Sequence, residues 1–172
     1  MKKIKRIAII LAIIFVFLLI INIPRLVALM VFSNPWVYNA DFDNHKEAFE
    51  VVKDYVLAEG YDENDILSLS HAEFHFYDLY DFESKQYLDC PEKIRDALEE
   101  ISKEAFYYKD SHFDLIRCRD GMVMFCGEGG PYRLVYSPNG NPRKSIKEEL
   151  SEHNYTVKCK KIQKSWYHVS IN

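Results

Sequence analysis

The chain contains one stretch that decides its fold, residues 113–126, which reads FDLIRCRDGMVMFC. Apolar side chains recur through residues 113–118 and 122–126, on either side of the dipeptide Asp120-Gly121. Asp-Gly is a strong signal for a type I′ turn, whose twist matches that of two antiparallel strands. The stretch therefore predicts a β-hairpin.

The register of this hairpin bears on the cysteines. The chain has four of them: Cys90, Cys118, Cys126 and Cys159. With a two-residue turn, Cys118 lies opposite Val123, and Cys126 lies opposite Leu115. Because side chains alternate between the faces of a sheet, the two hairpin cysteines point to opposite faces and are not expected to bond to each other. Either one of them forms a disulfide with one of the other two cysteines in an oxidising compartment, or the cysteines are buried thiols.

Upstream of the hairpin, the clearest element is a helix that begins at Pro91 and ends near Tyr108. Proline is typical of a first helical position. The apolar residues that follow recur at spacings of three and four, as one face of a helix requires: Ile94, Leu98, Ile101 and Ala105. An earlier helix is expected over residues 44–59, where Asn44 and Glu47 have capping-box spacing.

Alternation of apolar and polar side chains predicts strands in the rest of the domain. Residues 66–79 alternate with a break near Ser70, and residues 85–88 form a second short piece. After the hairpin, the pattern predicts a strand over residues 132–136, a helix over residues 144–152, and a last hairpin from residues 155–160 and 165–171. Strands that follow one another favour an α+β domain with a mainly antiparallel sheet and about three helices, which we expect on one face of the sheet.

The N-terminal part of the chain has the pattern of a membrane anchor. Four of the five residues that follow the initiator are basic, and every residue from Ile7 to Ile21 is apolar. In a helix, residues 7–23 would extend about 25 Å, close to the roughly 30 Å hydrocarbon core of a bilayer. We therefore expect a transmembrane anchor at residues 1–32, which contacts the lipid bilayer through residues 7–32.

The charges that flank this run predict its orientation. Positive charge stays on the cytoplasmic side of a membrane helix, so the basic N-terminus is expected inside the cell. The expected organisation is the anchor, a connector at residues 33–43 and an extracytoplasmic domain at residues 44–172. The alternative is a cleaved signal peptide and a secreted protein. The apolar run is longer than that of most signal peptides, and no small-x-small cleavage site follows it, which favours the anchor.

The formal charge of the whole chain, −4, conceals an uneven distribution. Residues 41–110 carry 20 acidic and 7 basic side chains, whereas residues 111–172 carry 6 acidic and 10 basic ones. The two halves either attract each other within the fold or face different partners. The chain has no basic stripe with interleaved aromatic residues, which argues against binding to nucleic acid.

The best candidate for a metal site is the segment His71-Ala72-Glu73-Phe74-His75. On a strand, His71, Glu73 and His75 share one face, with roughly 6–7 Å between neighbours. Two histidines and a carboxylate can bind a transition metal. The polar face of a half-buried strand explains the same alternation, with Ala72 and Phe74 turned to the core. Metal binding is therefore an alternative, and the sequence predicts no cofactor.

The sequence contains no motif that names a reaction. It has no G-x-S-x-G, no phosphate-binding loop and no C-x-x-C pair. The leading hypothesis is a single-pass membrane protein whose extracytoplasmic domain binds a protein or a cell-envelope component, for instance in an immunity or inhibitor role. The alternative is a metal-dependent surface enzyme that uses the strand face of His71, Glu73 and His75.

Overall fold

The computed structural model describes residues 41–61, 63–70, 77–105, 113–127, 132–150 and 155–171 of the chain. The chain divides after Val37 into two compact units, and all of the described residues belong to the second unit. The predicted anchor, residues 1–32, and residues 33–40 of the connector lie outside the described residues. No helix in the described ranges is long and apolar enough to cross a membrane.

The described residues form helices and strands in an order close to the predicted one. The strand segment predicted over residues 66–79 corresponds to two separate strands, at residues 63–69 and 79–81, and the helix predicted to end near Tyr108 is α-helical only to Glu100. The α-helices are α2 (Lys46–Ala58), α3 (Glu92–Glu100) and α4 (Arg143–Glu149). A π-helical turn, Ile101–Ala105, continues α3. The strands are β1 (Glu63–Leu69), β2 (Leu79–Asp81), β3 (Gln86–Tyr87), β4 (Phe113–Arg119), β5 (Met122–Gly127), β6 (Tyr132–Tyr136), β7 (Val157–Gln163) and β8 (Trp166–Ile171).

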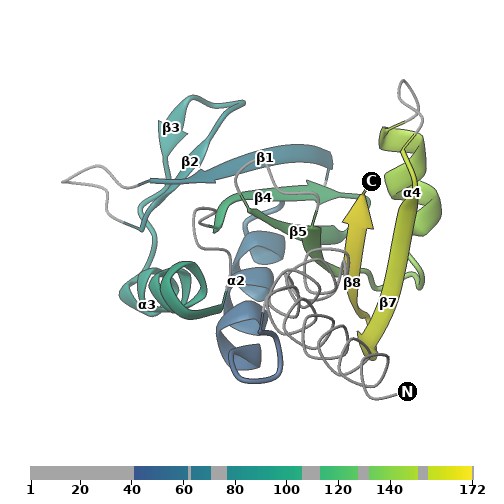
Figure 1. Ribbon diagram of the computed structural model, residues 1–172. Coiled ribbons are helices and arrows are strands. Elements are labelled where there is room, and N and C mark those ends of the chain that lie inside the picture. The colour runs from purple at the N-terminus through teal and green to yellow at the C-terminus, as the bar shows by residue number, and fades with distance from the viewer. Residues whose placement is uncertain are drawn as a thin grey trace, which may run out of the picture. The chain divides into compact units, whose positions relative to one another are not determined.

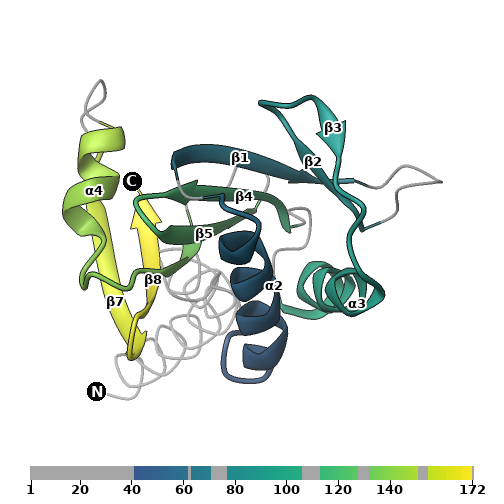
Figure 2. The same ribbon diagram turned by 180° about the vertical axis from the view of Figure 1, so that it is seen from behind.

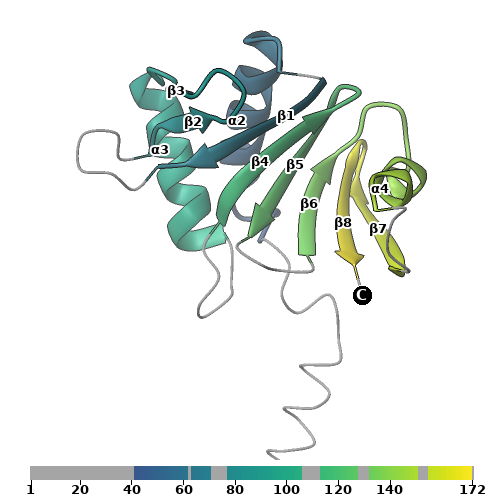
Figure 3. The ribbon, with the colours of Figure 1, turned by 90° about the horizontal axis from the view of Figure 1, so that it is seen from above.

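The eight strands form one sheet in the order β3-β2-β1-β4-β5-β6-β8-β7 (Figure 3). Every pair of neighbouring strands is antiparallel. Two connections depart from a simple meander, because α3 lies between β3 and β4, and α4 lies between β6 and the edge strand β7. The domain is therefore of the α+β class, as the succession of strands predicts.

The β4–β5 hairpin has the turn and the register that its sequence predicts. The backbone angle φ is 52° at Asp120 and 71° at Gly121. A positive φ at both central residues is the defining property of a type I′ turn. Cys118 pairs with Val123 across the hairpin. A two-residue signal thus determines which side chains of these strands face each core.

Helices α2 and α3 cover one side of the sheet, here named the first face (Figure 1, Figure 2). The centre of this core is aromatic. The ring of Phe49 on α2 lies 5.0 Å from that of Phe125 on β5 and 6.2 Å from that of Trp166 on β8. Phe42, which precedes α2, lies 4.8 Å from Trp166. These buried rings hold α2 against the middle of the sheet. Truncation of one such ring to alanine lowers the free energy of unfolding by roughly 3–5 kcal/mol.

A buried lysine joins α2 to the sheet on the same side. Lys53 Nζ lies 2.6 Å from Oε2 of Glu50 and above the ring of Tyr136, 4.7 Å from its centre. Oε1 of Glu50 accepts a hydrogen bond of 2.8 Å from Nε1 of Trp166. The carboxylate therefore satisfies both the buried ammonium and the indole, as buried polar groups require.

Helix α4 covers part of the opposite side, here named the second face. Ile146 of α4 is fully buried in a second apolar cluster. Its buried partners come from β5, β6, β7 and β8: Met124, Cys126, Val135, Val157, Tyr167 and Val169. The expectation that all helices lie on one face is therefore wrong. These strands carry apolar residues on both faces, so each face needs a cover.

The predicted start of α2 is also wrong in detail. The helix begins at Lys46, and its N-cap, His45, makes no capping hydrogen bond through its side chain. Nδ2 of Asn44 donates instead to Oδ2 of Asp41, at 2.7 Å. Nδ1 of His45 lies 2.8 Å from Oε1 of Glu100 at the end of α3. A contact between the two helices thus replaces the predicted capping box.

Candidate functional site

The predicted metal ligands His71, Glu73 and His75 lie outside the described residues, so their arrangement stays a prediction. Among the residues that the structure describes, no three histidine, cysteine, aspartate or glutamate side chains are grouped to hold a metal ion.

The four cysteines are free thiols. Cys118 lies in the core of the first face and Cys126 in that of the second, which agrees with the predicted alternation. Burial raises the pKa of Cys126 to about 11, although the guanidinium groups of Arg133 and Arg117 act in the opposite direction. Burial also raises the pKa of Cys159 to about 11. Both thiols are therefore protonated at neutral pH and are poor nucleophiles.

A continuous row of paired residues crosses the second face from one edge of the sheet to the other. In strand order it consists of Tyr87, Tyr80, Ser68, Leu115, Cys126, Arg133, Val169 and Cys159. The end of the row on β5, β6, β8 and β7 lies in the core beneath α4. None of the described helices contributes to the other end, on β3, β2 and β1. This uncovered end is the candidate binding surface.

Three aromatic side chains, here named the aromatic hairpin, occupy this end: Tyr80, Phe82 and Tyr87. Phe82 is 53% exposed and Tyr87 is 43% exposed. The ring of Tyr80 lies 5.4 Å from that of Phe82 and 5.1 Å from that of Tyr87. Large exposed apolar groups that gather in one place mark interaction surfaces, whereas single ones are ordinary.

The orientation of these rings distinguishes between two kinds of ligand. The ring planes of Tyr80 and Phe82 are inclined by 88°, and those of Tyr80 and Tyr87 by 62°. The three rings do not share a plane, so they form no extended flat platform of the kind on which a chain of sugar rings stacks. Inclined rings instead present edges and faces in several directions, as aromatic anchors in protein interfaces do.

Buried polar contacts fix the position of the aromatic hairpin. The carboxylate of Asp81 accepts hydrogen bonds from the backbone N–H of Glu83, at 2.9 Å, and of Ser84, at 3.3 Å. Burial acts to raise the pKa of Asp81, but hydrogen bonding by the Ser84 side chain and by these two backbone N–H groups outweighs it, and the pKa lies below its ordinary value. At the start of β2, the buried carboxylate of Asp78 accepts a bond of 2.7 Å from Nε of Arg95 on α3. These contacts support the turn that carries Phe82 and the strand that precedes it.

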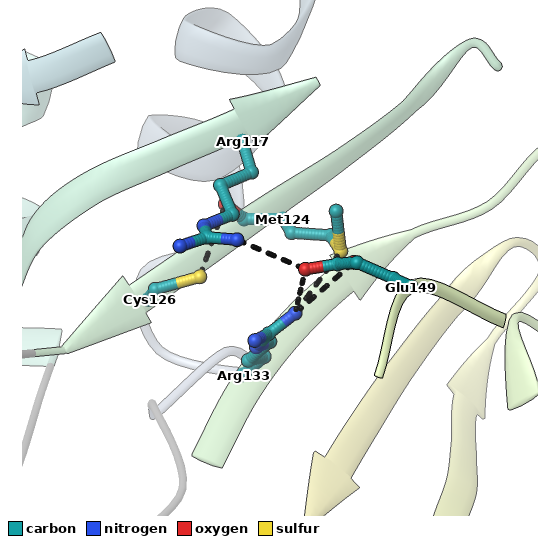
Figure 4. A network of polar contacts seen from close by, with 5 residues as sticks. All are labelled: Arg117, Met124, Cys126, Arg133 and Glu149. Atoms are coloured by element: carbon teal, nitrogen blue, oxygen red, sulfur yellow. Dashed lines mark hydrogen bonds and ion pairs between the residues drawn. The ribbon is translucent and has the colours of Figure 1, made fainter. Parts of the chain in front are cut away.

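Beside this surface, two arginines converge on one carboxylate (Figure 4). Nη1 of Arg117 on β4 donates to Oε1 of Glu149 on α4, at 2.9 Å. Nη1 of Arg133 on β6 lies 3.3 Å from Oε1 and 3.5 Å from Oε2 of the same carboxylate. It also lies 3.8 Å from Sδ of Met124. The group of Arg117, Arg133 and Glu149, here named the arginine pair and its carboxylate, therefore joins α4 to the sheet at the boundary of the covered region.

A cavity of about 160 Å³ adjoins this group. The residues that line it come from β1, β4, β5 and α4: Asp65, Ile66, Arg117, Cys118, Arg119, Met124 and Glu149. The register places Ile66 opposite Arg117, and Arg117 opposite Met124, so these three side chains share the second face. Asp65 pairs instead with Cys118, whose side chain belongs to the first face. The cavity thus combines two arginines and two carboxylates, those of Asp65 and Glu149, with apolar walls.

Comparison of the chain with protein-family models, with curated proteins and with solved structures found no significant match. What the fold defines is a class, an α+β domain built on a single eight-stranded antiparallel sheet. Its function must be inferred from the surfaces of the domain itself.

Sequence reasoning missed both parts of the second face. The alternation in residues 113–119 does place Leu115 and Arg117 on one face, which is a signal for a partly polar surface. No pattern connects Arg117 with Glu149, because 32 residues separate them along the chain. The exposure of Phe82 and Tyr87 depends on which face of the sheet lacks a helix, and the sequence did not show that.

Proposed function

We propose that the domain has no catalytic activity and binds a protein partner through the uncovered end of the second face. The observation that carries this proposal is the aromatic hairpin, where Phe82 in the turn after β2 and Tyr87 on β3 are exposed and each packs against the ring of Tyr80. A cluster of exposed aromatic residues on a rigid scaffold is the usual core of a protein interface. In this proposal the anchor at residues 1–32 holds the domain at the extracytoplasmic side of the membrane.

The charges around the aromatic hairpin support a particular kind of partner. Residues 79–89 carry three acidic side chains and one basic side chain, that of Lys85. Two of the acidic residues, Glu83 and Asp89, are exposed close to Phe82 and Tyr87 in the chain. Charges at the rim of an interface increase the association rate and help to exclude wrong partners. The partner therefore has an apolar patch bordered by basic residues.

Size, charge and proposed location also fit an immunity or inhibitor role. A tethered domain on the outer side of a membrane is in a position to intercept a basic protein that arrives from outside. The expected complex is rigid, because the aromatic hairpin is held by Asp81 and the pair of Asp78 with Arg95 before any partner binds. Preorganisation of this kind lowers the entropic cost of binding.

Site-specific photo-crosslinking in cells that make the full chain tests this proposal. A photoreactive phenylalanine replaces Phe82, Tyr87 or, as a matched control, Tyr155, an aromatic residue with nearly the same exposure, 44%, at the opposite end of the sheet. We expect one defined protein adduct from the first two positions and none from the third. The same adducts from all three positions, or no adduct from Phe82 and Tyr87, would contradict the proposal.

A further inference from the structure

The arginine pair has more hydrogen-bonding capacity than its carboxylate can use. Each guanidinium group has five N–H donors, whereas one carboxylate accepts roughly four hydrogen bonds. Both arginines use Nη1 to reach Glu149. Arg117, Arg133 and Glu149 together carry one positive charge in excess, and the carboxylate of Asp65 also lines the cavity. Arg119, which lines the same cavity, has a carboxylate of its own, since its Nε lies 3.4 Å from Oδ2 of Asp120.

The size of the adjoining cavity suits a single functional group. Its volume of about 160 Å³ is smaller than the roughly 300–1,000 Å³ of pockets that hold drug-sized ligands. The side chains of Ile66 and Met124 line it beside Arg117. Such a site fits the end of one acidic side chain, with its methylene groups against the apolar walls.

The cavity lies next to the aromatic hairpin. The backbone N–H of Phe82 donates to the carbonyl oxygen of Ile66, at 3.2 Å. Ile66 in turn pairs with Arg117 on the neighbouring strand. A protein that covers Phe82 therefore also lies over Ile66 and reaches the edge of the cavity.

We propose that this cavity takes a carboxylate of the bound protein partner, which Arg117 holds through its planar fork of donors. Guanidinium groups match carboxylates in bidentate geometry and bind them more strongly than neutral acceptors do. Glu149 competes with the incoming carboxylate for Arg117, while Arg133 keeps Glu149 and α4 in place. This inference rests on the proposed function, and it adds one acidic residue to the otherwise basic rim of the partner.

Methyl NMR of the full chain in detergent micelles tests the inference with sodium acetate as the probe. The chain has four methionines, and Met124 lines the cavity. With ¹³C-methyl methionine, and with Met124→Leu to assign the signal, acetate should shift the Met124 resonance saturably at constant ionic strength. Sodium chloride alone should not. A linear, non-saturating shift would overturn the inference.

Three variants separate a binding role from a structural one. Arg117→Gln should weaken acetate binding by about tenfold or more, because a charge-assisted contact is lost. Glu149→Gln should strengthen it several-fold, because the competing carboxylate loses its charge. Arg143→Gln, at an exposed arginine on α4, should leave it unchanged. If these residues had a purely structural role, Glu149→Gln would not bind acetate more tightly than the parent. Acetate binding by Arg117→Gln as tight as that of the parent would overturn the inference.

Two further arms complete the test. If inorganic phosphate binds more tightly than acetate, the assignment to a carboxylate is wrong. Should Glu149→Gln fail to fold, as the methyl spectrum would show, the comparison of the parent with Arg117→Gln still decides. Specific crosslinks from Phe82 without acetate binding would remove only this inference. Acetate binding without crosslinks would remove the proposed function and leave an anion site.

Discussion

Single residues decide the chemistry of both faces of the sheet. On the first face, Nδ1 of His168 and Oγ of Ser170 are buried without a hydrogen-bond partner among the described residues. Burial lowers the pKa of His168 to about 4, and the charge of Lys160 acts in the same direction, whereas Asp43 opposes it. The imidazole is therefore neutral at physiological pH, and protonating it within the fold is costly.

This residue predicts a loss of stability in mild acid. The unfolded chain takes up a proton on His168 near pH 6.5, whereas the folded chain does so only near pH 4. The stability that the neutral His168 side chain contributes to the folded state is therefore fully present above pH 6.5, and it is lost as the pH falls toward 4. Between pH 7 and 5 we expect the free energy of unfolding to fall by about 1–2 kcal/mol more in the parent than in His168→Asn. Urea denaturation at the two pH values measures this, and equal losses in both proteins would contradict it.

The site residues illustrate the limit of prediction at this scale. The alternation of side chains along β4, which is visible in the sequence, assigns Arg117 to the same face as Leu115. Its partner, Glu149, reaches it only because α4 folds back across the second face. A contact between residues so distant in the chain depends on the packing of whole elements, and no local pattern encodes it.

Among the elements, the β4–β5 hairpin is where sequence and structure agree best. Its turn, strands and register all follow from Asp120-Gly121 and the apolar runs beside it. The information is local, because a type I′ turn needs two residues that tolerate a positive φ. The start of α2 is the opposite case, since the contact of His45 with Glu100 on another helix replaces a local cap.

The turn of the β4–β5 hairpin predicts how a methyl group at Gly121 changes stability. A Cβ at Gly121 would meet only Cγ of Pro138, at 3.8 Å, so there is room for it. The cost comes from φ, which is 71° there and disfavours alanine. We expect Gly121→Ala to lower the free energy of unfolding by about 1 kcal/mol. Asp120→Asn is the matched control, because asparagine tolerates the left-handed region, and it should change stability little. A similar loss in both variants, by urea denaturation, would argue against this cause.

At the scale of the whole molecule, the proposed function depends on where the domain lies. The orientation proposed from the basic N-terminus would place the acidic domain outside the cytoplasm, and it would thereby limit which partners can reach the aromatic hairpin. It also bears on the cysteines, because an oxidising compartment favours disulfides. The free thiols of Cys90, Cys118 and Cys126 are buried, which protects them from oxidation there.

Cell fractionation tests the anchor directly. Because every residue from Ile7 to Ile21 is apolar and no small-x-small cleavage site follows them, we expect the protein in the membrane fraction after an alkaline carbonate wash, with its N-terminal residues intact. N-terminal sequencing of that fraction supplies the measurement, and a variant that lacks residues 2–32 serves as the control. A mature N-terminus well beyond residue 20, or recovery in the medium, would show a secreted protein instead.

The sequence by itself determined the class of the domain, the order of its elements and the register of its central hairpin. These follow from the periodicity of side chains and from turn residues, which act over a few positions of the chain. Only the tertiary structure decided that α4 lies opposite α2 and α3, and that the β3–β2–β1 end of the second face stays uncovered by the described helices. It also brought Arg117, Arg133 and Glu149 together. Burial is shared between elements far apart in sequence, so the surface that remains for a partner is a property of the assembled fold.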